Sequence, residues 1–140
     1  MVLHITSEDL FLDLKKRINR FDEVKWNDIR NNHLRTIKND INLWNSSIRN
    51  NRIEEIILAR LRVGHTRLTH QFLYTKDLRP VCETCTEYLT VKHFFKCKKY
   101  KKFRRKTQVS ENISVALADN PDKCDSVIKY IKMCNLFSKI

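Results

Sequence analysis

The chain has one glycine and two prolines among its 140 residues, too few for the tight turns of a hairpin-rich β architecture. Its longest uncharged apolar run, residues 56–59, is far shorter than the roughly 18 residues that a membrane-spanning helix needs. The first residues lack the basic patch, apolar stretch and cleavage site of a secretory signal. We therefore expect a helical protein in a reducing, intracellular compartment, with no part in the membrane.

Several catalytic signatures are also missing. The sequence has no Gly-rich phosphate loop, no Gly-flanked nucleophilic serine and no acidic cluster suited to two-metal chemistry. We expect no enzymatic activity from this chain.

The apolar pattern predicts a mainly α fold. Capping residues at 6–7 precede a helix whose apolar residues, Leu10, Phe11, Leu14, Ile18 and Phe21, recur with helical period. A second helix is predicted over about 24–38, a loop over 45–51, a third helix from 53 to the only glycine, Gly64, and a short helix after it. Asn120 and Pro121 are typical of the start of a last helix.

Four residues, Cys82, Cys85, His93 and Cys97, stand in the spacing C-x2-C-x7-H-x3-C. Zn²⁺ prefers four such ligands in a tetrahedron, and four protein ligands leave no position for an activated water. The spacing predicts one structural Zn²⁺ in a CCHC knuckle, with residues 88–91 as one strand of a short β-hairpin. The alternative is a chance assembly of buried thiols and a surface histidine. Cys124 and Cys134 are expected to be free core thiols.

The predicted fold class is thus a small helical domain with an embedded zinc-stabilised knuckle. Its expected parts are a helical region over residues 1–78, the knuckle and a basic helix over 79–106, and C-terminal helices over 107–140 that pack on the first region.

Positive charge is concentrated in one third of the chain. The net charge is +12, and residues 60–106 hold fourteen Lys or Arg against three Asp or Glu. Such a concentration predicts a polyanionic partner, nucleic acid first and an anionic membrane surface second.

Two basic segments carry the predicted nucleic-acid contacts, which are expected to reach phosphates without reading bases. One surrounds Gly64, where the two histidines could instead cap helices or pack in the core; the other follows the last cysteine, where Tyr100 and Phe103 are expected to anchor a helix to the core. The predicted contacts are Arg60, Arg62, His65, Arg67, His70, Lys92, Lys96, Lys98, Lys99, Lys101, Lys102, Arg104, Arg105 and Lys106. A nuclear-import signal or a merely solvated face is the other interpretation of the second segment.

The run RLRVGHTRLTHQFLY at residues 60–74, followed by CETC and LTVKHFFKCKKY, is similar to the C-terminal tail of jockey-type non-LTR retrotransposon polyproteins. HLRTIK at 33–38 and the final IKYIKMCNLFSKI extend the similarity over nearly the whole chain. The resemblance implies that the four predicted metal ligands correspond to the family's CCHC ligands. Lys96 and Lys98 depart from it, because the family commonly has an acid and a proline there.

The resemblance further implies an accessory role in holding template RNA or target DNA, beside upstream reverse transcriptase domains whose catalytic carboxylates this chain lacks. The leading hypothesis is a zinc-dependent, noncatalytic nucleic-acid-binding module, in the nucleus and cytoplasm. The alternative is a structural or protein-docking module whose basic run serves nuclear import. RNA or DNA preference, sequence specificity and oligomeric state stay open.

Overall fold

The computed structural model describes residues 6–140, and these are mainly helical, as predicted. The α-helices are α1 (Ser7–Asp28), α2 (His33–Ile37), α3 (Arg52–Val63), α4 (Arg67–His70), α5 (Phe72–Thr75), α6 (Val91–Lys96), α7 (Lys101–Thr107), α8 (Ile113–Ala116) and α9 (Pro121–Met133), and the 3-10 helices are η1 (Asn45–Ser47) and η2 (Lys98–Tyr100). In the described part of the chain, no helix combines the length and apolar character needed to cross a membrane.

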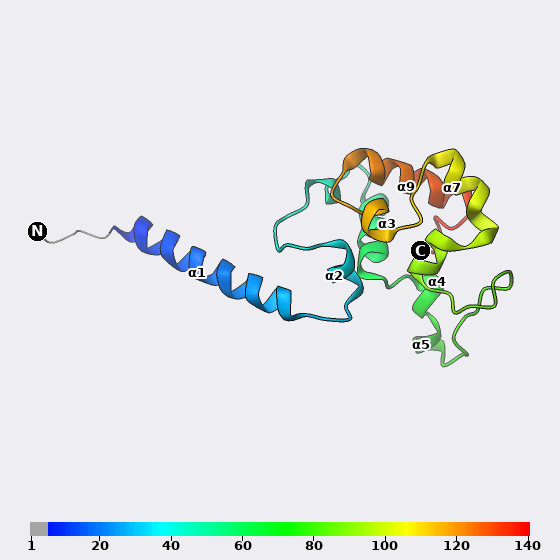
Figure 1. The fold of residues 1–140 in the computed structure, drawn as a ribbon, viewed down its shortest axis with the longest axis horizontal. Coiled ribbons are helices and arrows are strands. Elements are labelled where there is room, and N and C mark those ends of the chain that lie inside the picture. The colour runs from blue at the N-terminus through cyan, green and yellow to red at the C-terminus, as the bar shows by residue number, and fades with distance from the viewer. Residues whose placement is uncertain (1–5) are drawn as a thin grey trace, which may run out of the picture.

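Helix α1 stands away from the body of the molecule (Figure 1). Thr6 begins it with a capping box: its hydroxyl accepts from the Asp9 N–H, and the Asp9 carboxylate accepts from the Thr6 N–H. No residue of α1 is buried, so its predicted apolar face does not reach the core.

The second predicted helix, over 24–38, is wrong in its boundaries. Helix α1 continues through Val24 to Asp28, and the chain then breaks at Asn31, which adopts a left-handed conformation (φ 59°). Asn32 caps α2 through its side chain, which accepts from the Arg35 N–H. The asparagines therefore separate two helices here, as their competing side-chain hydrogen bonds favour.

The ends of α3 and α9 follow the predicted signals. Gly64 ends α3 in a left-handed conformation (φ 84°), and its N–H donates to Arg60 O. Asn120 caps α9 by accepting from the Lys123 N–H, and Pro121 occupies the first helical position.

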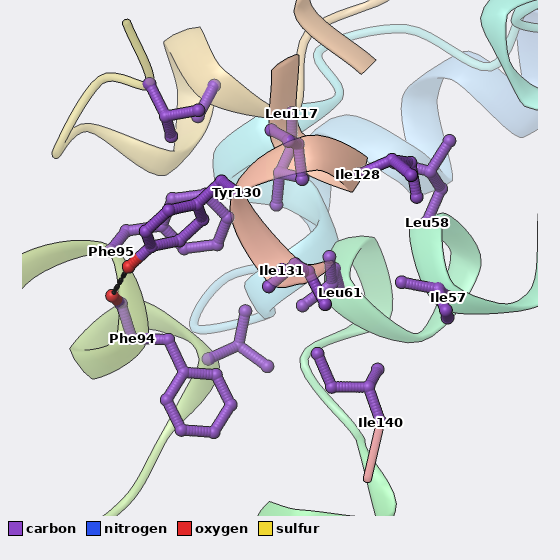
Figure 2. Close-up of a cluster of buried hydrophobic side chains, with 14 of the residues drawn as sticks. Ile57, Leu58, Leu61, Phe94, Phe95, Leu117, Ile128, Tyr130, Ile131 and Ile140 are labelled. Carbon is purple, nitrogen blue, oxygen red and sulfur yellow. Dashed lines mark hydrogen bonds between the residues drawn. The ribbon is translucent and has the colours of Figure 1, made fainter. Parts of the chain in front are cut away.

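One hydrophobic core holds the body together. Figure 2 shows Leu58 and Leu61 of α3, Phe94 and Phe95 of α6, and Tyr130 of α9 in this cluster. The Tyr130 hydroxyl donates to Phe94 O at 2.6 Å. Residues 79–106 thus share their core with the helices before and after them, and the two cysteines outside the CCHC spacing, Cys124 and Cys134, are free and buried as predicted.

The predicted β-hairpin is not formed. Among the described residues the only β pairing near the cysteines is a single antiparallel bridge between Val81 and Tyr88. The Thr86 N–H donates to Cys82 O in the tight turn that joins the two bridged segments, and the pairing extends no further than the Leu89 N–H, which donates to Pro80 O. The next residue begins a helix instead, because the Thr90 hydroxyl caps α6 by accepting from the His93 N–H. Residues 88–91 therefore lead into a helix rather than a strand.

Candidate metal centre and basic surface

The four predicted ligands come together in space. Cys82 and Cys85 lie on the turn before α6, His93 lies within α6, and Cys97 is its C-terminal cap. Their ligand atoms all lie within 4.8 Å of one another, and Cys97 Sγ is 3.7 Å from both Cys82 Sγ and Cys85 Sγ. Tetrahedral thiolates bound to zinc at about 2.3 Å would be about 3.8 Å apart. The four residues could hold one metal ion.

The His93 ring is oriented for ligation. Its Nδ1 lies 3.1 Å from Glu87 Oε2, whereas its Nε2 is buried and has no hydrogen-bond partner. Leaving a buried polar atom without a partner is costly. A carboxylate on one ring nitrogen is also the usual arrangement that fixes a metal-binding histidine. The unpartnered Nε2 therefore fits a metal bond from this nitrogen.

The surroundings shift the pKa values of two of the cysteines in opposite directions. Burial raises the pKa of Cys82, but the adjacent His93 ring and the backbone N–H groups of Cys85 and Thr84 outweigh it and lower that pKa to about 6. Burial and the neighbouring sulfurs of Cys82 and Cys85 instead raise the pKa of Cys97 to about 11. The crowding thus opposes ionisation of Cys97 by the chain alone, and a divalent cation at the centre would favour its thiolate.

Residues outside the spacing hold this centre in place. The buried Arg104 guanidinium donates to Cys97 O at 2.6 Å and to Lys96 O at 3.4 Å, and it pairs with Glu111 at 3.0 Å. These bonds satisfy carbonyls at the end of α6, which its own helix leaves without partners. The sequence reasoning missed the supporting roles of Glu87 and Arg104, because only the folded chain shows which side chains reach the ligands.

Most of the predicted contact residues are accessible. The exposed contact residues after the last ligand form what we call the basic surface: Lys98, Lys99, Lys101, Lys102, Arg105 and Lys106. None of these six forms an ion pair among the described residues. Tyr100 and Phe103 are partly buried against the core, as predicted. Their anchoring directs the neighbouring cationic side chains into solvent.

Two predicted contacts are wrong. Arg62 is 5% exposed and Arg104 is 3% exposed. The Arg62 guanidinium donates to Leu117 O, Ala118 O and the hydroxyls of two serines, and it lies 4.8 Å from the centre of the Trp44 ring. Both guanidinium groups are therefore used within the fold and are not available to phosphate.

The remaining contacts line two hollows. His65 and His70 stack with ring centres 3.8 Å apart in a hollow of about 470 Å³, which Arg60 and Arg67 also line. Neither histidine is a core residue, and His70 Nδ1 lies 2.7 Å from the Thr69 hydroxyl. Lys92 and Lys96 line the other hollow, of about 770 Å³, which also has asparagine side chains in its wall.

Comparison with protein-family models, with curated proteins and with solved structures finds no match for this chain.

Proposed function

We propose that this chain is a noncatalytic module in which one structural Zn²⁺ shapes a basic surface that binds nucleic acid. Four protein ligands would fill a tetrahedral shell, so the metal would act on structure and not on a bound water. The resemblance to the tail of a retrotransposon reverse transcriptase supports an accessory role in holding RNA or target DNA beside upstream polymerase domains.

The observation that carries this proposal is the continuity of the metal centre with the basic surface. Cys97 ends α6, and the first lysine of the basic surface, Lys98, follows it directly. Arg104, from the same basic segment, bonds the Cys97 carbonyl from the interior. The position of the exposed cations therefore depends on the geometry of the centre, and unpaired cations are what phosphate contacts require.

Metal analysis tests the zinc. We expect one zinc per chain in protein purified without chelator, and loss of that zinc in Cys85→Ser. The matched control is Cys134→Ala, a buried cysteine outside the centre, which should keep it. Zinc-free wild-type protein, or full zinc in Cys85→Ser, would contradict this part of the proposal.

Salt-titrated binding tests the basic surface. Phosphate-dominated affinity falls with salt with a log–log slope of roughly −0.9 per phosphate neutralised on duplex DNA and −0.7 on single strands. Replacing Lys101, Lys102 and Arg105 by glutamine should reduce the slope by about two to three on either substrate. The control removes the same charge from α1, through Lys15, Lys16 and Arg20, and should leave the slope unchanged.

A flat salt dependence, or equal effects of the two triple variants, would count against nucleic-acid binding at this surface. The alternative is then a docking module whose basic run serves nuclear import, and the exposed apolar face of α1 favours it. Partners that persist after nuclease treatment would support that function, whereas partners that are lost would support binding through nucleic acid.

A further inference from the structure

Helix α1 exposes an apolar surface that the body of the molecule does not cover. Seven of its large apolar side chains are between 49% and 67% exposed: Leu10, Phe11, Leu12, Leu14, Ile18, Phe21 and Val24. Within residues 6–140, the side-chain hydrogen bonds between α1 and the body come from its last turn: the Trp26 indole donates to Lys38 O, and Asn27 accepts from Arg35. Most of the stability of helices in proteins comes from the packing of an amphipathic face, and α1 buries none of its residues against the body.

Four of these side chains have the spacing of a coiled coil. Phe11, Leu14, Ile18 and Phe21 are separated by three, four and three residues, so they occupy alternating a and d positions of a heptad. We propose that α1 pairs in parallel with α1 of a second copy of this chain through these four layers. This proposal does not depend on the metal or on nucleic-acid binding.

The charges beside the apolar residues favour the parallel arrangement. With Phe11 at position a, Arg17 is at position g and Asp22 is at position e of the next heptad. In a parallel pair, position g of one helix faces position e of the next heptad in the other helix. Arg17 of each copy therefore lies beside Asp22 of the other copy. An antiparallel pair that aligns the same four layers would place Lys15 against Lys15 and Arg17 against Arg17. Like charges at these positions oppose pairing, so the sequence selects the parallel dimer.

The charge balance of α1 also distinguishes a second copy from an anionic surface. Its 22 residues include six acidic and five basic side chains, in contrast to the strongly basic segment at 60–106. Helices that lie on anionic membranes have a polar face rich in Lys and Arg. A near-neutral helix with complementary flanking charges fits a copy of itself better.

The apolar contact is short, so the dimer should be weak. The four layers extend only from Phe11 to Phe21, and the next a position holds a charged residue, Lys25. Interfaces below about 1,200 Å² of total buried surface are mostly transient. We expect a monomer–dimer equilibrium that depends on concentration rather than a permanent dimer.

Sedimentation equilibrium of the full chain across a concentration series, without nucleic acid, tests the association. We expect Arg17→Asp to weaken dimerisation at least tenfold, and the double exchange Arg17→Asp with Asp22→Arg to restore it. Arg20→Asp, a charge reversal at an outward c position, is the control for the change of charge. Arg17 also pairs with Asp13 of its own helix at 2.8 Å, and the double exchange does not restore that pair, so recovery in the double exchange is the deciding result. A monomer at every concentration, or equal effects of the reversals at Arg17 and Arg20, would overturn the proposal.

Oxidative cross-linking tests the orientation. Leu14 faces Leu14 of the second copy only in the parallel pair, so Leu14→Cys should form a disulfide with Leu14→Cys of the second copy. Helix α1 itself contains no native cysteine. An antiparallel pair would require Leu14→Cys mixed with Ile18→Cys, and cross-linking in that mixture alone would overturn the parallel arrangement. If the chain does not self-associate but sediments together with anionic vesicles, α1 binds a membrane surface and the proposal of a dimer is overturned.

Discussion

At the scale of single residues, arginine has two different uses in this chain. Arg104 and Arg105 are neighbours in the basic segment, yet the first is buried against the end of α6 and the second is exposed. The planar guanidinium group, with five donors, can satisfy several carbonyls at once, which a lysine cannot do in the same geometry. The buried Arg104 therefore serves the fold, whereas the exposed Arg105 next to it is accessible from solvent.

The pair provides a matched experiment. Arg104→Met should lower the free energy of unfolding by about 2 kcal/mol, because it leaves the carbonyls of Lys96 and Cys97 and the Glu111 carboxylate without this charged donor. Arg105→Met should change it by less than about 0.5 kcal/mol. Denaturant unfolding of the two variants measures the difference, and equal losses would show that Arg104 does not brace α6.

The contact between the Glu87 carboxylate and His93 leads to a second prediction. Glu87→Gln keeps the shape of the side chain but weakens the contact to His93 Nδ1, so zinc affinity should fall by about tenfold, the low end for groups that orient metal ligands. Competition with a chromophoric chelator measures the change. Glu83→Gln, an exposed glutamate on the same turn, is the control. Indistinguishable affinities for the two variants would refute an orienting role.

At the scale of elements, the turn after α3 depends on a glycine for two reasons. Gly64 has a φ of 84°, which side chains with a Cβ rarely adopt, and a Cβ placed there would lie 2.6 Å from His33 Cγ. The same His33 ring bonds Leu61 O through Nε2 at 3.1 Å. Gly64 thus lets α2 approach the end of α3.

Gly64→Ala should therefore lower stability by about 2 kcal/mol from backbone strain and contact together. In Gly64→Ala with His33→Ala, the contact is removed and only the strain remains, so the combined loss should be smaller than the sum of the single losses. Thermal unfolding of all four proteins measures this coupling. Additive losses would place the whole cost in the φ angle.

At the scale of the whole molecule, the candidate metal centre and the core form one unit. Helix α6 carries His93 and, directly after it, Phe94 and Phe95, which are both fully buried in the core. Residues from before, within and after the CCHC segment pack in the same cluster. Release of the metal would thus affect a shared core rather than a detachable loop.

Chelation should lower the melting temperature of the whole domain in a single transition. A loss of a few kcal/mol corresponds to about 10 °C or more at this size. Removing residues 1–20, of which the described residues 6–20 are all exposed, should alter neither the melting temperature at low concentration nor its response to chelator. Scanning calorimetry measures both, and a separate low-temperature transition on chelation would show that the centre unfolds on its own.

The sequence by itself determined the features that depend on neighbours along the chain: the helix ends at Gly64 and Asn120, the four ligands in their spacing, and the heptad of α1. Tertiary structure decided which charges are exposed, where each helix packs and whether a strand forms. Arg62 and Arg104 lie in basic segments typical of a binding surface, but both side chains are buried. Each donates to a backbone carbonyl outside its own helix: Arg62 to Leu117 O and Arg104 to Cys97 O. Likewise, residues 88–91 could have formed a strand, but Thr90 caps α6 instead. This helix buries Phe94 and Phe95 in the core, which a local pattern does not predict.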